Sequence, residues 1–497
     1  MYLVSGGGRV MDYLIKPGYG PEWGSGGVFG LTYYRGVLYY TLSMEARSYF
    51  HEEGKEKVYD FHLLGPGPAS GGDTYNAVDV VDEFIYFGGW VHNPAVYKVR
   101  DGFAGEIDFR NKYSHVHEYN INEGEVRLLW SESARAEREW AGEVSEIIYD
   151  RLNDKLLLGR ADGHYNLGVY ELDRRGELKR LSEVPGLKGS LYLEFACFDM
   201  QPDWRRGVDG VQCYDPYSGR MIYHKIEDWA KVSVDGGAVE SRGSGYATTA
   251  YARYWHFFRG GVLVGNPIEP DVEEPAFIRL FDFPSTSYSP SRSNALVVGG
   301  GIVAVFNSYS HGVLHPSHGS KTTVKAVNYI AGPSVLVYIT PPYARIAMAL
   351  GARVTSMTKK GDRIILGTNN SPNLGGRDAT RLDVGVREIV SVSEEDILNP
   401  RNPPVVFRVE GYMVGDRFFG GIPLTGYKTA SIRMFSSKDN TLRVYEYDIG
   451  LPPRLIDSCD YNVRTGWNNI SLGSHYNIVS FKLSNPDDKA IIYITLN

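Results

Sequence analysis

The sequence predicts an all-β protein, a seven-bladed β-propeller followed by a C-terminal β-sandwich, and three observations lead to this prediction. The 497 residues include 57 glycines and 36 tyrosines; glycine marks turns and tyrosine favours half-buried strands. A hairpin pattern recurs seven times before residue 395. After residue 406 the rhythm changes to short strands at roughly ten-residue spacing, which is typical of a separate sandwich.

The recurring unit is an extended segment, a tight polar turn, an apolar strand and then a glycine or polar loop, which is the sequence signature of a β-hairpin. Five clear copies and two weaker ones occupy residues 30–47, 77–93, 147–164, 252–267, 354–370, 195–215 and 295–312. Successive turns lie about 40 to 70 residues apart, enough for four strands and their loops. The pattern therefore predicts seven propeller blades over residues 1–398.

A linker and a second domain follow. The stretch "NPRNPPVV" at 399–406 is rich in Pro and Asn, and these residues interrupt regular structure. Eight short strands then follow without the hairpin turn of the first part. They predict a β-sandwich of the jelly-roll kind over residues 407–497.

Composition excludes some classes of function. The net charge is -7 and there is no long Lys/Arg block, which argues against nucleic-acid binding. No run of 18 apolar residues and no signal-peptide core are present, so no membrane span is expected. The expected location is cytoplasmic, or extracellular if a signal was removed. Low cysteine content and dense tyrosine would suit a thermophile.

The cysteines carry little information by themselves. Cys197, Cys213 and Cys459 are odd in number and show no C-x-x-C spacing. Neither a disulfide framework nor a cysteine zinc site is therefore expected. The oligomeric state is left open by the sequence.

Polar and aromatic residues gather in the loops that leave the second strand of each hairpin. In a propeller these loops emerge on one face and converge around the axis, where propellers bind ligands. The residues in question are Glu45, Arg47, Trp90, His92, Asn93, Arg160, Asp162, His164, Tyr165, Asn166, Asn266, Glu269, Asn307, His311, His315, His318, Asn369 and Asn370. Histidine combined with aromatic residues is unusual for a merely water-facing loop, so the pattern predicts a ligand-binding face.

The segment "YSHVHEY" at 113–119 belongs to the same predicted blade as His92. Strand alternation places His115 and His117 on one side together with Tyr113 and Tyr119. One of the two histidines could reach the axis near His92. The alternative is that both are structural histidines that stack on tyrosines.

Two further candidates concern a metal and a cation. The segment "HGVLHPSH" spaces His311, His315 and His318 so that they could supply three imidazoles to a zinc ion; a calcium ion is the other metal considered. In "YARYW" at 251–255 we expect Arg253 to lie on an innermost strand and to line the channel. A structural cation–π contact of this arginine is the alternative.

The full-length pattern resembles a family of uncharacterised archaeal β-propeller proteins, which implies a fold and no activity. Over residues 75–180 the sequence also resembles, more loosely, the seven-bladed polysaccharide lyases that cleave ulvan and related rhamnose–glucuronate polymers. In those enzymes two histidines, a tyrosine and an arginine carry β-elimination. The residues that could match are His92 in "GGWVHN", His115 in "YSHVHEY", Tyr165 in "DGHYN", and Arg160 or Arg253.

This resemblance implies a lyase acting on a uronate-containing glycan, with His92 or His115 as base, Tyr165 as acid and an arginine neutralising the carboxylate. The lack of a secretion signal departs from those enzymes. A non-catalytic propeller that binds a protein or glycan partner is the alternative. A glycoside hydrolase with two facing carboxylates is a second alternative, for which Glu45, Asp162 and Glu269 are available.

Overall fold

The structure is a computed structural model. It describes residues 12–15, 27–42, 45–66, 71–93, 96–100, 103–202, 207–227, 244–258, 260–280, 290, 293–307, 334–350, 353–369, 387–399, 404–411, 419–448 and 454–497. This part of the chain is built almost entirely of antiparallel sheets, with one short 3-10 helix, η1 (Phe61–Leu64), and one short α-helix, α2 (Glu394–Leu398). The fold is therefore all-β, as predicted.

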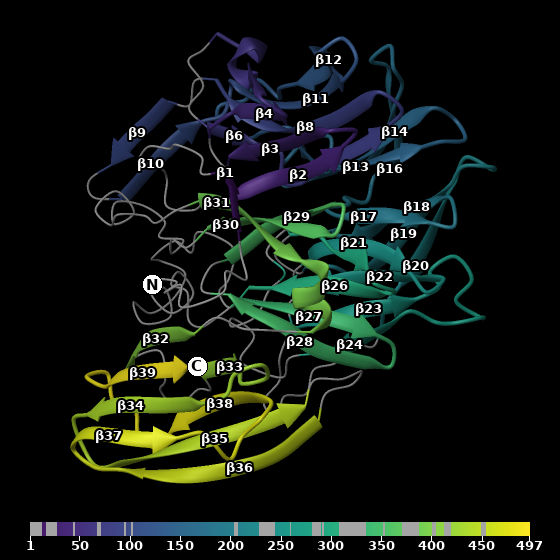
Figure 1. Ribbon diagram of the computed structural model, residues 1–497. Helices are drawn as coiled ribbons and strands as arrows, with labels where there is room; N and C mark the ends of the chain where they lie inside the picture. Colours follow the sequence, from purple (N-terminus) through teal and green to yellow (C-terminus); the bar gives the residue numbers. More distant parts are fainter. Residues whose placement is uncertain are drawn as a thin grey trace.

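The sheets follow one another along the chain, and most pair their strands in sequence order (Figure 1). The first sheet contains β2 (Val28–Tyr34), β3 (Val37–Leu42), β4 (Arg47–Glu52) and β5 (Lys55–Asp60). The second contains β6 (Gly71–Asp73), β7 (Val78–Val81), β8 (Phe84–His92), β11 (Lys112–Asn120) and β12 (Glu125–Glu132). A two-stranded hairpin, β9 (Val96–Arg100) and β10 (Phe103–Asp108), is inserted between β8 and β11.

Three regular sheets come next. The third contains β13 (Glu143–Asp150), β14 (Lys155–Ala161), β15 (Gly168–Leu172) and β16 (Leu178–Ser182). The fourth contains β17 (Gly189–Tyr192), β18 (Phe195–Met200), β19 (Gly210–Asp215) and β20 (Arg220–Lys225). The fifth contains β21 (Ser244–Ala250), β22 (Arg253–Phe258), β23 (Gly261–Gly265) and β24 (Ala276–Arg279).

The seventh sheet takes a strand from the start of the chain. The sixth sheet contains β25 (Leu296–Val298), β26 (Gly301–Phe306), β27 (Ser334–Thr340) and β28 (Tyr343–Leu350). The seventh contains β29 (Arg353–Lys360), β30 (Arg363–Asn369), β31 (Arg387–Ser393) and β1 (Asp12–Ile15). Because β1 pairs antiparallel with β31, distant segments of the sequence complete one sheet.

Buried apolar side chains lie between each sheet and the next, because a single sheet cannot bury its own faces. One representative pair for each consecutive contact is Tyr39 with Phe87, Tyr86 with Leu158, Leu157 with Phe198, Cys197 with Phe258, Trp255 with Val337, Val303 with Met357, and Ile365 with Tyr40. The last pair joins the seventh sheet to the first. The arrangement is therefore propeller-like.

The predicted hairpins are all present, but two occupy a different place in their sheets. Residues 195–215 and 252–267 form the second and third strands of their sheets, whereas the other five predicted hairpins form the first and second. The expectation that Arg253 lies on an innermost strand is therefore wrong. The turn at 251–252 separates β21 from β22, and Arg253 begins the second strand.

Because neighbouring strands run antiparallel, the connections between them lie alternately on two opposite sides of the set of seven sheets. Turns between first and second strands and between third and fourth strands lie on one face, which we call the turn face. Connections between second and third strands, and from each sheet to the next, lie on the other, which we call the loop face. Residues 93, 109–111, 133–142 and 162–167 belong to the loop face.

After residue 404 two four-stranded sheets enclose a core of their own. One contains β32 (Val405–Glu410), β39 (Ile491–Leu496), β34 (Ala430–Ser436) and β37 (Gly466–Ser471). The other contains β33 (Phe419–Pro423), β38 (Ile478–Leu483), β35 (Asn440–Asp448) and β36 (Arg454–Val463). Met434, Ile494, Val444 and Phe481 pack in the core between them. Ile478, by contrast, is buried in the cluster between the fifth and sixth sheets.

The cysteine expectation is corrected by the structure. Cys197 on β18 and Cys213 on β19 form a disulfide and are buried. They lie directly opposite each other in the register of the two strands. The sequence could not indicate this pairing, because two cysteines 16 residues apart become neighbours only once the strands pair. Cys459 is free.

A buried carboxyl group lies on an inner strand of the third sheet. Glu146 accepts hydrogen bonds from the backbone N–H groups of Ile147 and Gly189, each at 3.2 Å. The Lys188 ammonium lies 3.5 Å from the Glu146 carboxylate. Burial nonetheless dominates and raises the pKa of Glu146 to about 7, because desolvation disfavours the ionised form.

The Glu146 carboxyl should make the free energy of unfolding depend on pH. Its folded pKa is above the usual value of 4.5, so the folded state binds the proton more tightly than the unfolded state. The contribution to stability is full below about pH 4.5 and is lost as the pH rises through 7. Glu146→Gln should therefore gain stability relative to wild type across this window in urea melts at several pH values. Glu183→Gln, at an exposed position, is the control, and parallel curves for Glu146→Gln and wild type would contradict the assignment.

Ile478 should couple the C-terminal sheets to the fifth and sixth sheets. The side chain is 2% exposed within their shared cluster, so Ile478→Ala should cost about 2 to 5 kcal/mol in chemical denaturation. Ile456→Ala, on the exposed side of β36, should change stability little. A midpoint for Ile478→Ala equal to that of wild type would show that residues 407–497 stand apart from residues 1–398, the division that the sequence predicts.

Candidate functional site

A row of aromatic rings runs along the loop face from the second sheet to the third. Ring centroids lie 5.3 Å apart between Trp90 and His92 and 5.4 Å apart between His92 and Phe109. They lie 4.4 Å apart between Phe109 and Trp140 and again between Trp140 and His164. The row begins at the buried end of β8 and ends at the exposed His164. It brings three of the predicted residues, Trp90, His92 and His164, into one structure.

The buried Lys112 occupies the space enclosed by this row. Its ammonium lies 4.9 Å from the Trp90 ring, 5.7 Å from the Phe109 ring and 4.3 Å from the Trp140 ring, and it forms an ion pair with Glu143. Cation–π attraction and the ion pair hold the rings in place. The Lys112 side chain therefore occupies the space among the Trp90, Phe109 and Trp140 rings.

The two histidines proposed as bases lie in separate surroundings. His92 is 7% exposed, and burial together with the nearby Lys112 charge lowers its pKa to about 3. His115 is fully buried, its Nδ1 lies 3.1 Å from Nδ1 of His117, and burial lowers its pKa to about 3. His117 contacts the Tyr59 hydroxyl at 3.1 Å. The structural alternative for the "YSHVHEY" segment therefore holds for His117, which contacts a tyrosine. His115 instead packs against Phe61, and its Nε2 has no hydrogen-bond partner among the described residues. The placement of His115 near His92 is corrected.

Arg160 is fully buried, and two of its three guanidinium nitrogens have polar partners, while Nη1 has no hydrogen-bond partner within the described ranges. Nε donates to the Gly142 carbonyl at 3.1 Å, and the outer nitrogen forms an ion pair with Glu132 at 2.5 Å. The planar group lies 4.7 Å from the Trp130 ring and 4.9 Å from the Tyr170 ring. Arg160 thus ties the second sheet to the third.

The accessible residues of this region form an exposed rim on the third sheet, which we call the Tyr165 rim. Tyr165 is 46% exposed and its hydroxyl donates to the Glu139 carboxylate, a contact that raises the pKa of Tyr165. Asn166 donates to Glu132 at 2.7 Å. The Trp140 indole N–H donates to the backbone carbonyl of Asp162 at 2.7 Å. Planar rings, carboxylates and an amide therefore stand together at the surface.

Other predicted residues on the loop face have structural contacts. Asn307 is buried and exchanges two hydrogen bonds of 2.8 Å with the backbone of Val354, which links the sixth sheet to the seventh. Asn93 is fully buried. Glu45 forms an ion pair with Arg387 at 2.9 Å, so it joins the first sheet to the seventh.

Three predicted residues lie on the turn face. Arg253 forms an ion pair with Glu273 at 2.7 Å. Asn266 accepts backbone hydrogen bonds from Ile268 and Glu269 in the connection from β23 to β24. Because this connection joins third and fourth strands, Arg253, Asn266 and Glu269 are on the opposite face from the Tyr165 rim, which corrects their expected location.

The proposed metal ligands cannot be placed. His311, His315, His318 and Asn370 lie outside the described residues, as does the side chain of Asn369 at the end of β30. Within the ranges that the structure describes, no group of three or more His, Cys, Asp or Glu side chains is arranged to hold a metal ion.

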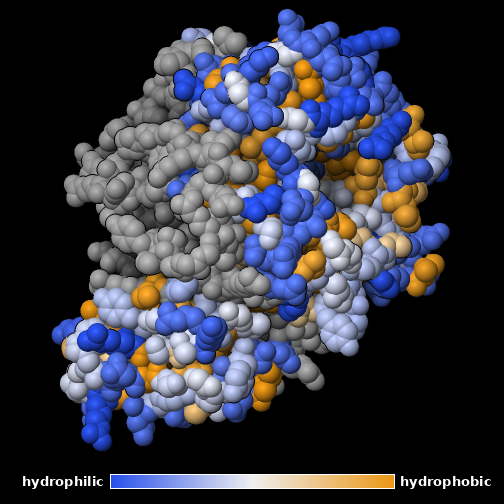
Figure 2. Space-filling view, in the orientation of Figure 1, coloured by the Kyte–Doolittle hydropathy of each residue, from blue (hydrophilic) through white to orange (hydrophobic). Residues whose placement is uncertain are grey.

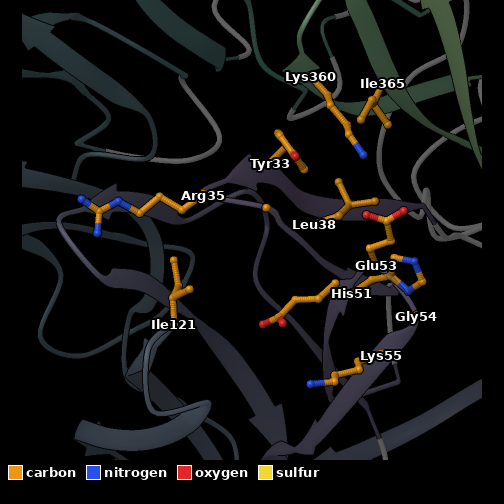
Figure 3. A pocket seen from close by; sticks show the side chains of 12 residues that line it. Tyr33, Arg35, Leu38, His51, Glu53, Gly54, Lys55, Ile121, Lys360 and Ile365 are labelled. Carbon is orange, nitrogen blue, oxygen red and sulfur yellow. The ribbon is translucent and has the colours of Figure 1, made fainter.

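A cleft on the turn face contains none of the predicted site residues. Its volume is about 630 Å³ and it lies between the first and seventh sheets (Figure 3). The lining residues are Tyr33, Arg35, Gly36, Leu38, His51, Glu52, Glu53, Gly54, Lys55, Ile121, Lys360 and Ile365. The available signal was the charge in the turns "YYRG", "HEEGKEK" and "TKKGD". The first and third belong to the predicted hairpins at 30–47 and 354–370, and the second lies outside all seven.

No helix in the described ranges has the length and apolar character needed to cross a membrane. On the face visible in Figure 2, hydrophobic residues form small groups among hydrophilic ones.

Solved structures resemble this chain only distantly. An exo-β-1,3-galactanase from Phanerochaete chrysosporium has a TM-score of 0.28 at 8% identity, covering 85% of this chain and 95% of that one. Sqt1 from Saccharomyces cerevisiae has a TM-score of 0.37 at 9% identity, covering 72% and 80%. A puromycin-hydrolyzing peptidase from Mycobacterium tuberculosis has a TM-score of 0.37 at 11% identity, covering 74% and 52%. Likenesses this weak carry no argument about activity.

The family comparison is more direct. No curated protein matches the chain. A family model matches residues 38–377, which span most of the seven sheets described above. The chain therefore belongs to the family described as "Uncharacterized protein conserved in archaea (DUF2139)".

Proposed function

We propose that this protein is a non-catalytic glycan-binding β-propeller whose binding site is the Tyr165 rim. In this proposal the seven sheets are the blades of one propeller, and the two C-terminal sheets form a β-sandwich attached through Ile478. The closed series of apolar clusters between consecutive sheets supports the blade count. The shared core of Met434 and Val444 supports the sandwich.

The observation that carries the function is the half-exposed Tyr165 beside Glu139, Asn166 and the Trp140–His164 ring pair. A sugar ring presents an apolar C–H face and a rim of hydroxyl groups. Aromatic faces can cover the first, while carboxylates and amides exchange hydrogen bonds with the second. Since Glu132 is already paired with Arg160 and Glu139 and Asp162 add two further carboxylates, a neutral glycan suits the rim better than a polyuronate.

The contacts of the proposed catalytic residues argue against β-elimination. An imidazole with a pKa of about 3, as in His92, is a weak base at neutral pH. Arg160 is fully buried and pairs with Glu132, so its guanidinium is out of reach of a substrate carboxylate. The hydrolase alternative is likewise unsupported, because Glu45 pairs with Arg387, while Glu269 and Asp162 lie on opposite faces.

Tyr165→Ala should weaken binding of a neutral polysaccharide at least about tenfold, because it removes the exposed ring of the rim. Affinity electrophoresis against a panel of neutral and acidic polysaccharides, β-1,3-galactan and polygalacturonate among them, measures the change. Tyr217→Ala is a matched control, since Tyr217 is 69% exposed and also donates to a glutamate, Glu194, but lies on the turn face. Equal loss in both variants, or no binding to any polysaccharide, would reject the proposal.

The same panel tests catalysis directly. Incubation with ulvan and polygalacturonate should produce no ultraviolet absorbance from an unsaturated sugar, because the base and the cation are buried. An increase in absorbance that His92→Gln abolishes would contradict the non-catalytic assignment and restore the lyase hypothesis.

A further inference from the structure

The cleft on the turn face has walls held in fixed positions by contacts between the first and seventh sheets. The Tyr33 backbone N–H donates to Oγ1 of Thr358 at 2.9 Å. The Lys360 ammonium lies 4.8 Å from the Tyr33 ring. Leu38 and Ile365 belong to the same buried cluster. Because these contacts cross from one sheet to the other, the cavity exists before any ligand arrives.

The charged side chains that line the cleft do not pair with one another in the part of the chain that the structure describes. Arg35, Lys55 and Lys360 bring three cations, and Glu52 and Glu53 bring two carboxylates. Figure 3 shows Lys360 reaching into the cavity from the side opposite Glu53. Within the part of the chain that the structure describes, none of the five takes part in an ion pair.

Lys359, the residue before Lys360, differs from it in having an ion-pair partner. It forms an ion pair with Glu394 outside the cleft. Surface lysines and glutamates normally reach nearby partners in this way, at little gain in stability. Lys360 instead stays over the Tyr33 ring with its ammonium in the cavity, so it can serve a ligand.

We propose that this cleft binds a monosaccharide carrying one anionic group, either a carboxylate or a phosphate. Three cations against two carboxylates leave one net positive charge, which balances a carboxylate and also attracts a phosphate monoester, whose charge is about −1.5 to −2 at pH 7. The Glu52 and Glu53 carboxylates accept hydrogen bonds from sugar hydroxyls. The partly exposed Ile121 and Tyr33 offer apolar surface to the C–H face of the ring. The volume falls in the range of about 300 to 1,000 Å³ found for small-molecule sites.

Isothermal titration calorimetry on the full chain at low ionic strength tests this inference with four probes: glucuronate, glucose 6-phosphate, glucose and inorganic phosphate. At least one of the two anionic sugars should bind, at least about tenfold more tightly than glucose or inorganic phosphate, because only an anionic sugar engages both the cations and the carboxylates. The arms with glucuronate and glucose 6-phosphate distinguish a carboxylate from a phosphate ligand. Affinity should fall as salt is added.

Variants locate the site. Lys360→Met and Glu53→Gln should each weaken binding at least about tenfold, while Lys359→Met and Tyr165→Ala should not. The proposal would be overturned if neither anionic sugar bound, or if Lys360→Met and wild type bound with equal affinity. Equal affinity for phosphate and glucose 6-phosphate would reduce the cleft to a simple anion site and overturn it as well. Since Tyr165 lies on the opposite face, failure here is separate from failure of the glycan-binding rim.

Discussion

The structure depends on the burial of apolar side chains between each four-stranded sheet and the next. A sheet of this size has two apolar faces and can bury neither by itself, so each sheet packs against the adjacent sheets. The contacts of Ile365 and Ile389 with Tyr40 close the series, since they give the seventh sheet the first as its partner. Loop residues that make no contact between sheets, Tyr165 among them, can then be used for binding.

Burial also explains why similar side chains on one face do such different work. Arg160 and Tyr165 are five positions apart on and after one strand, yet the first is fully enclosed and the second is 46% exposed. The enclosed guanidinium is held by Trp130, Tyr170 and Glu132, so its charge stabilises the packing of two sheets. The ring of Tyr165 keeps an open face, which is what recognition requires.

Local features of the fold could be predicted from the sequence, and long-range features could not. The hairpins at 30–47 and 147–164 were predictable because turn chemistry and strand composition lie within a few residues of each other. The place of residues 252–267 in their sheet was not, because a hairpin signal does not tell which strand is innermost. That one-strand shift moved Arg253 to the other face. The cleft at Lys360 was hidden for a related reason, since its walls come from turns more than 300 residues apart.

The pairing of β1 with β31 sets the order in which the molecule can be completed. The seventh sheet gains its fourth strand from residues 12–15, while the first sheet must wait for Ile365 and Ile389 to bury its remaining face. During synthesis residues 12–15 therefore leave the ribosome long before β31, the strand with which they pair. Such distant closure is costly in chain entropy and slow. Until Ile365 and Ile389 have emerged, the first sheet keeps one apolar face uncovered, and exposed apolar surface of this kind makes a folding chain prone to aggregate.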